Sequence, residues 1–190
     1  MNIFFDTETT GVPRNYNAPV SDVDNYPRLV QLGYVLVNNG KVLHQYEAII
    51  KPDGFEIPQG ASRVNGISTE KALNEGEDLV KVLDEFKFWA KASDKLIGHN
   101  VKFDCSIMGA EYWRKHGFDP LAEKKKVCTM LSGAKFVGIP GNYGKYKYPK
   151  LQELYRALFL KDFPQTHTAR DDILHTVECY DEMVKRGIIV

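Results

Sequence analysis

The chain has 190 residues, and its 25 Lys and Arg residues balance its 25 Asp and Glu residues, so the formal net charge is zero. A neutral chain gives no reason to infer a polyanionic partner from overall charge, so any nucleic-acid function must rest on local motifs. This length suits a single core, and 43% hydrophobic residues are enough to form it. We therefore expect one domain spanning residues 1–190.

The three cysteines include no C-x-x-C pair, which argues against a disulfide framework or a zinc site. The N-terminus lacks the features of an export signal, and no apolar run approaches the roughly 20 residues of a membrane span. We therefore expect a cytoplasmic protein with reduced thiols and no membrane partner.

Three strands are predicted near the N-terminus, over residues 2–6, 29–37 and 41–50. Asn38-Asn39-Gly40 separates the second from the third and is a strong hairpin signal. This part of the chain is therefore expected to form an antiparallel-rich sheet.

Helices and strands alternate in the rest of the chain. From Leu79 onward, apolar residues recur at spacings of three and four, which predicts a helix with one buried face. Further on we expect strands at 95–100 and 127–130, helices at 103–116, 151–160 and 169–186, and a long loop at 137–149. The order predicts an α/β fold with a mixed sheet covered by helices.

Two acidic residues end the first predicted strand, in the segment FFDTETTG. Side chains two apart in a strand share a face, so the carboxylates of Asp6 and Glu8 stand side by side and repel. A pair of acids before Thr-Thr-Gly also fits an ordinary solvated turn. This motif alone does not decide between the two.

Further acids follow in two other segments, IGHNVKFD and HTARDDIL. Asp104 lies at the start of a predicted helix, where a carboxylate also suits the helix dipole. Thr168 and Asp171 fit a capping box at the start of the last helix. Asp172 lies beside the buried stripe of that helix and is expected to face the interior cleft, with His167 on the loop before it.

Together these segments resemble the DEDDh exonucleases, the family that includes the proofreading subunit of the bacterial replicative polymerase. The family motifs D-x-E-x-T-G, G-H-N-x-x-F-D and H-x-A-x-x-D stand in order at residues 6–11, 98–104 and 167–172. Each motif alone is weak, but three in order over this length are specific. The resemblance implies an RNase H-like fold, with a mixed five-stranded sheet flanked by helices, and it selects Asp172 over Asp171.

The resemblance also implies a catalytic site. It assigns Asp6, Glu8, Asp104 and Asp172 as catalytic ligands of two Mg²⁺ or Mn²⁺ ions, which suits hard oxygen donors. It assigns His167 as the general base, whose unperturbed pKa near 6.5 suits proton transfer at neutral pH.

For substrate binding, the resemblance points to three short segments. Thr9, Thr10 and Gly11 are expected near the sugar of the terminal nucleotide, and His99 and Asn100 belong to the second motif. Many relatives carry His-Gly-Ile where this chain has Asn65-Gly66-Ile67. A His-dependent base contact is therefore not expected, but Ile67 remains a candidate apolar wedge. A plain turn before a helix at Thr69 is the alternative.

The segment NYGKYKYPK, residues 142–150, interleaves three tyrosines with three lysines. Tyrosines that stack on bases, beside lysines that follow phosphates, are typical of surfaces that hold single strands. A solvated loop whose tyrosines pack on the body of the protein is the alternative.

We therefore expect a metal-dependent 3′–5′ exonuclease that hydrolyses single-stranded DNA ends and releases 5′-mononucleotides. A 3′–5′ exoribonuclease is the nearest alternative, since no residue is seen to read the 2′-hydroxyl. A non-catalytic polymerase accessory or binding module is the third, and the intact set of acids counts against it. DNA polymerase subunits are candidate partners.

Overall fold

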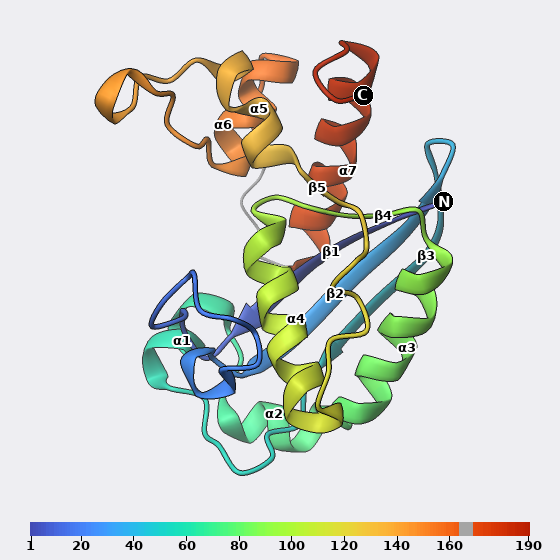
Figure 1. Cartoon of the computed structure of the whole chain (residues 1–190), viewed down its shortest axis with the longest axis vertical. Helices are drawn as coiled ribbons and strands as arrows, with labels where there is room; N and C mark the ends of the chain where they lie inside the picture. Colours follow the sequence, from blue (N-terminus) through green and yellow to red (C-terminus); the bar gives the residue numbers. More distant parts are fainter. Residues whose placement is uncertain (164–168) are drawn as a thin grey trace.

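The computed structural model of the chain describes residues 1–163 and 169–190. A five-stranded sheet forms its centre, in the order β3-β2-β1-β4-β5 (Figure 1). The strands are β1 (Asn2–Thr9), β2 (Leu29–Asn38), β3 (Lys41–Ile49), β4 (Lys95–Gly98) and β5 (Lys126–Cys128). The central strand β1 pairs antiparallel with β2 and parallel with β4. The sheet is therefore mixed, as the sequence predicts.

Helices cover both faces of this sheet (Figure 1). They are α1 (Gln59–Asn65), α2 (Thr69–Glu75), α3 (Leu79–Ala92), α4 (Val101–His116), α5 (Thr129–Val137), α6 (Leu151–Phe159) and α7 (Ala169–Lys185). Short 3₁₀ turns lie at Val23–Asn25 and Asn142–Gly144. Within the described part of the chain, no helix has the length and apolar character needed to cross a bilayer.

Two helices were not predicted from the sequence, α1 and α5. The expected strand at 127–130 is shorter, because β5 ends at Cys128 and α5 begins at Thr129. The buried side of α5 includes Gly133 and Ala134, which carry little hydrophobic signal. Gly133 lies so close to α6 that a Cβ there would come within 2.7 Å of a methyl group of Leu154. Small residues thus permit close packing of α5 on α6 while hiding the helical pattern.

Side chains of β1 divide between two hydrophobic clusters. Ile3 and Phe5 belong to the cluster that contains residues of α3 and α4. Phe4 belongs to the cluster that contains residues of α6 and α7. Because side chains alternate along a strand, Asp6 and Glu8 continue the row of Phe4. The strand therefore directs both carboxylates to the face covered by α6 and α7.

A buried ion cluster fixes α4 against the chain that enters β2. The Glu111 carboxylate is fully buried, and its Oε1 accepts hydrogen bonds from Arg28 Nε at 2.9 Å and from the Leu29 N–H at 3.0 Å. Arg114 forms an ion pair with the same oxygen at 2.9 Å and donates to the Tyr26 carbonyl at 2.7 Å. Losing one member of such a cluster costs about 3–5 kcal/mol, because its partners stay buried and unpaired.

Candidate active site

The acids of the first two motifs meet where β1 and β4 end. Since these strands are parallel, their carboxyl ends lie at the same edge of the sheet. Gly98 ends β4, and α4 turns back sharply from it. A Cβ at Gly98 would lie 3.1 Å from the Phe5 carbonyl oxygen and 3.3 Å from Val101 Cβ. The glycine therefore permits the close approach that brings Asp104, in the first turn of α4, to β1.

Asp104 is hydrogen-bonded directly to β1. Its buried Oδ1 accepts from the Thr7 N–H at 3.0 Å and from Thr7 Oγ1 at 2.7 Å. Thr7 lies between Asp6 and Glu8, so the bonds hold the Asp104 carboxylate beside the D-x-E motif. Asp104 thus connects α4 to the central strand. From the sequence alone, this residue could have been a helix-capping carboxylate and nothing more.

The charges of three other acids act on Asp6. Burial raises the pKa of Asp6 well above its usual range, and the negative charges of Asp104, Glu8 and Asp172 raise it further. The residue opposite Asp6 on β2 is Gly33, so no side chain from that strand fills the space beside the carboxylate. The fold therefore gathers acids from β1, α4 and α7 around one point.

Asp104 also titrates abnormally. Burial raises the pKa of Asp104 to about 7, although the hydrogen bonds from Thr7 act in the opposite direction. The charge of Glu8 contributes to the increase. When the carboxylates are ionised at the same time, they repel one another, because little water is present to screen their charges. Protonation of one carboxylate or binding of a cation relieves this repulsion.

By donor chemistry, the four carboxylates fit a hard divalent cation such as Mg²⁺ or Mn²⁺. Among residues 1–163 and 169–190, however, no three His, Cys, Asp or Glu side chains are arranged as ready-made ligands of one ion. The structure thus shows mutual electrostatic interaction of the acids, and the assignment of Asp6, Glu8, Asp104 and Asp172 as metal ligands stays a prediction.

The third motif is described only in part. Helix α7 begins at Ala169, as expected, with Asp171 and Asp172 in its first turn. Asp172, and not Asp171, is among the charges that raise the pKa of Asp6, in agreement with the motif. The predicted general base His167 and the predicted N-cap Thr168 lie outside the described residues.

A cavity of about 370 Å³ adjoins Glu8. One wall is the end of β1 with the turn after it, and the other is α1; the lining residues include Thr9, Thr10, Gly11, Val64, Asn65 and Phe103. The turn is held by a hydrogen bond from Thr9 Oγ1 to the Gly11 carbonyl at 2.6 Å. The structure therefore places four of the predicted substrate-binding residues, Thr9, Thr10, Gly11 and Asn65, around one cavity.

The prediction that Ile67 acts as an apolar wedge is wrong for this structure. Ile67 is buried in a small cluster with Val30, Ile57 and Ala72. After the left-handed Gly66, the Ile67 N–H donates to Asn65 Oδ1 at 3.0 Å, and the turn leads the side chain inward.

The apolar surface that faces the cavity comes from two other residues. Val64, on α1, is 77% exposed, and Phe103, on α4, also lines the cavity. Neither was singled out from the sequence, although Phe103 belongs to the second motif.

His99 has a structural position, contrary to the expectation that it contacts substrate. Its Nε2 lies 2.9 Å from the Pro149 carbonyl oxygen, and its Nδ1 lies 3.0 Å from Thr129 Oγ1. A carbonyl can only accept, so Nε2 carries the proton. Burial lowers the pKa of His99, which favours this neutral form. Asn100, the other predicted contact from this motif, is exposed at the start of α4.

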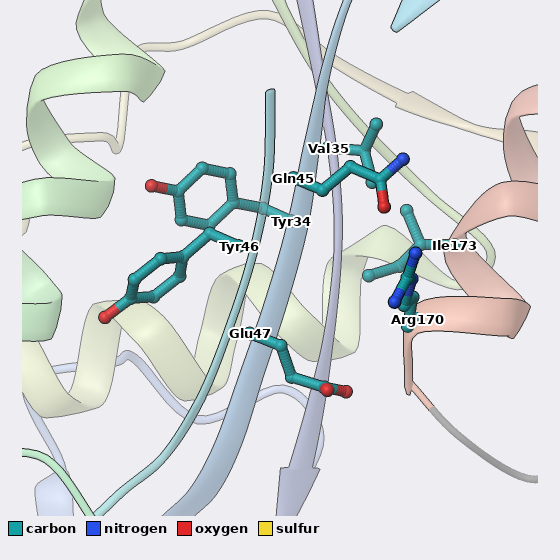
Figure 2. Close-up of a pocket in the computed structure, with 7 residues that line it drawn as sticks. All are labelled: Tyr34, Val35, Gln45, Tyr46, Glu47, Arg170 and Ile173. Carbon is teal, nitrogen blue, oxygen red and sulfur yellow. The ribbon is translucent and has the colours of Figure 1, made fainter. Parts of the chain in front are cut away.

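A second cavity, of about 270 Å³, lies between α7 and the strands β2 and β3 (Figure 2). Arg170 and Ile173 border it from α7, and Glu47 borders it from β3. Glu47 is in register with Gly33, which in turn pairs with Asp6, so all three lie on one face. Arg170 thus places a guanidinium on the face that carries the acidic site, a feature that the sequence analysis did not identify.

Comparison with known proteins agrees with this geometry. The RNase_T family model, described as exonuclease, matches residues 3–180. The chain belongs to this exonuclease family. The three motifs therefore identified the family correctly as DEDD-type 3′–5′ exonucleases. The match runs from β1 into α7 and so covers most of the chain.

The exonuclease also resembles segments of much longer polymerases. A PolC-type DNA polymerase III from Pediococcus pentosaceus is 29% identical over 138 residues, or 71% of this chain and 8% of the polymerase. The corresponding protein from Listeria innocua is 28% identical over 150 residues, or 79% of this chain and 9% of the polymerase. The exonuclease thus spans less than a tenth of these relatives.

Solved structures of E. coli exonuclease I share the fold. The complex with a dA16 oligonucleotide gives a TM-score of 0.74 at 18% identity and covers 97% of this chain and 41% of that chain. The zinc-bound complex with single-stranded DNA also gives a TM-score of 0.74, at 19% identity. This match covers 97% of this chain and 40% of that chain. The predicted RNase H-like arrangement is therefore confirmed.

The raised pKa of Asp104 predicts an unusual pH dependence of stability. In chelator, the folded chain holds this proton up to about pH 7, whereas the unfolded chain loses it near pH 4. The contribution of Asp104 to the free energy of unfolding is therefore greatest below about pH 4. It falls as the pH rises from about 4 to about 7.

Asp104→Asn removes this decline and keeps an oxygen for Thr7. At pH 8 its free energy of unfolding, from urea titrations in chelator, should exceed that of the wild type by up to about 4 kcal/mol, at about 1.4 kcal/mol per pKa unit. The exposed control Asp24→Asn should follow the wild type. Parallel pH profiles for Asp104→Asn and wild type would contradict the assignment.

Proposed function

We propose that the chain acts as a single exonuclease domain that removes nucleotides from the 3′ end of single-stranded DNA and releases 5′-mononucleotides. The observation that carries this proposal is the raised pKa of Asp6, which results from burial and from three neighbouring carboxylates. Perturbed acids at one end of a sheet, beside a cavity, are typical of a catalytic centre.

Mg²⁺ or Mn²⁺ ions would be held by Asp6, Glu8, Asp104 and Asp172. The family is generally dependent on divalent metals, and the donor set suits these hard cations. Two such ions, when bound, would supply electrostatic stabilisation to the attacking and leaving oxygens of the phosphodiester. Thr7 keeps the Asp104 carboxylate in place for this role through its two hydrogen bonds.

The terminal nucleotide would occupy the cavity beside Glu8. A volume of about 370 Å³ lies within the range of small-ligand sites. Val64 and Phe103 offer apolar contacts for a base, and the turn formed by Thr9, Thr10 and Gly11 adjoins the sugar side. His167 would accept the proton of the attacking water, as its place in the third motif implies.

DNA is favoured as the substrate on the basis of the relatives. The similar segments belong to DNA polymerases, and the structural neighbours include exonuclease I bound to DNA oligonucleotides. None of the described residues that line the cavity is identified as selecting for or against a 2′-hydroxyl. A comparison of DNA with RNA is therefore part of the test.

The test uses 5′-labelled single-stranded DNA and RNA of one sequence, with Mg²⁺, Mn²⁺ or chelator. We expect a ladder that shortens from the 3′ end, faster on DNA, only when metal is present and Asp6 is intact. Asp6→Asn should lose nearly all activity, while the exposed control Asp24→Asn should retain it. Faster cleavage of RNA would replace the DNA proposal with an exoribonuclease. Tight binding without any cleavage would favour an accessory module.

The role of His167 has its own prediction. His167→Ala should bind Mn²⁺ as the wild type does, because the residue is not a ligand in this proposal. Its single-turnover rate should fall by about 10²–10⁴, the usual contribution of a positioned general base. The measurement is rapid-quench cleavage with calorimetric Mn²⁺ titration as the control. A rate within a few-fold of the wild type would rule out this assignment.

A further inference from the structure

The positive charge of this neutral chain is concentrated in one segment. No Asp or Glu occurs between Glu123 and Glu153, and seven lysines lie in that interval, namely Lys124, Lys125, Lys126, Lys135, Lys145, Lys147 and Lys150. Three of them fall within residues 138–150, which we call the Tyr/Lys hairpin. Figure 1 shows this segment as a loop that projects from the ends of α5 and α6.

Three tyrosines of the hairpin face solvent. Tyr143 is 99% exposed, Tyr146 is 50% exposed and Tyr148 is 59% exposed. The expected alternative, in which these rings pack on the body of the protein, is therefore not what the structure shows. Exposed aromatic faces in a lysine-rich segment offer stacking surfaces for bases.

The hairpin is closed by its own backbone, which fixes how these side chains are presented. Pro140 and Tyr146 form an antiparallel bridge. The Gly141 N–H donates to the Lys145 carbonyl at 2.8 Å, and the Lys147 N–H donates to the Ile139 carbonyl at 2.9 Å. A Cβ on Gly141 would lie 2.8 Å from the same Lys145 oxygen, so only glycine allows this closure.

The base of the hairpin is attached to the second catalytic motif. The Pro149 carbonyl accepts the Nε2–H of His99, five residues before Asp104. Within the hairpin, Lys147 is already engaged, since its Nζ donates to Glu153 Oε1 at 2.7 Å. Lys145 and Lys150 form no ion pair with any residue in the described part of the chain, so their charges are available to a ligand.

We propose that the Tyr/Lys hairpin binds the single strand upstream of the bond that is cut. Tyr143, Tyr146 and Tyr148 stack on unpaired bases, while Lys145 and Lys150 contact the phosphates between them. The direction of the strand in this proposal rests on the proposed function, which places the 3′ end of the strand at Asp6 and Glu8. Since both interactions are indifferent to base identity, the surface holds strands without sequence preference.

The first test is strand-length dependence. The affinity for a long single strand is measured by fluorescence anisotropy in the presence of chelator. In the presence of metal, KM and kcat are then measured both on that long strand and on a dinucleotide. Replacement of the three tyrosines by Ala should weaken binding of the long strand by about fivefold or more for each stacked base. The dinucleotide lacks the upstream nucleotides that the hairpin is proposed to hold, so it should be cleaved with unchanged KM and kcat.

Replacement of the same tyrosines by Phe is the matched control, because phenylalanine keeps the stacking face. It should retain long-strand affinity. Gly141→Ala keeps all tyrosines and lysines but opposes hairpin closure, so it should weaken binding of the long strand alone. Unchanged affinity in the triple Ala variant would overturn the proposal.

The lysines are tested by salt dependence. Lys145→Gln with Lys150→Gln should reduce the slope of log affinity against log salt by about 1.4, because each phosphate contact on a single strand contributes about 0.7. Lys41→Gln with Lys71→Gln, at two exposed lysines outside this segment, should leave the slope unchanged. Equal slopes for both double variants would contradict the phosphate contacts.

These outcomes are separable from failure of the proposed function. If the wild type cleaves neither strand nor dinucleotide, the function is wrong, while the anisotropy measurements in chelator still report on the hairpin. If the wild type cleaves both substrates and the triple Ala variant binds the long strand normally, only the hairpin proposal fails.

Discussion

Thr7 donates two hydrogen bonds to the buried carboxylate of Asp104, and the arrangement of the candidate active site depends on this contact. It fixes the first turn of α4 against the central strand, between Asp6 and Glu8. The charges of Asp104 and Asp172 also raise the pKa of Asp6. Gly98 makes the approach possible, since a larger residue would press on the Phe5 carbonyl. The close approach of α4 to β1 therefore brings the carboxylates together. Their mutual repulsion explains why such a site would bind a divalent cation.

The structure separates charge of opposite sign around this centre. The acids lie at the carboxyl end of β1, whereas the segment between Glu123 and Glu153 carries lysines and no acids. A neutral net charge thus conceals an acidic cluster and a basic segment, and the basic segment is joined to the second motif through His99. This division suits a polyanionic strand whose end must enter an acidic pocket, because binding energy gained along the strand can offset repulsion at its end.

Sequence reasoning succeeded where a motif and a periodic pattern pointed to the same place. The apolar run before Asp6 predicted the central strand, and Asp172, which the third motif selects, is among the charges that raise the pKa of Asp6. It failed where tertiary contacts decide. The left-handed turn at Gly66 directs Ile67 inward, and two internal partners occupy both nitrogens of His99. Glu111 was missed because a helical pattern does not reveal which distant arginine will meet a buried acid.

The central claim is that the acids of β1, α4 and α7 form one cation site, and calorimetric titration with Mn²⁺ near pH 8 tests it most directly. We predict that the wild type binds two ions and that Asp6→Asn and Asp172→Asn each lower the affinity by more than about 100-fold, beyond the roughly 10–100-fold loss typical of outer-shell changes. The exposed control Asp24→Asn should bind as the wild type does. If the wild type shows no binding, or if both variants retain its affinity, the acids do not act together on a metal ion and the account is wrong.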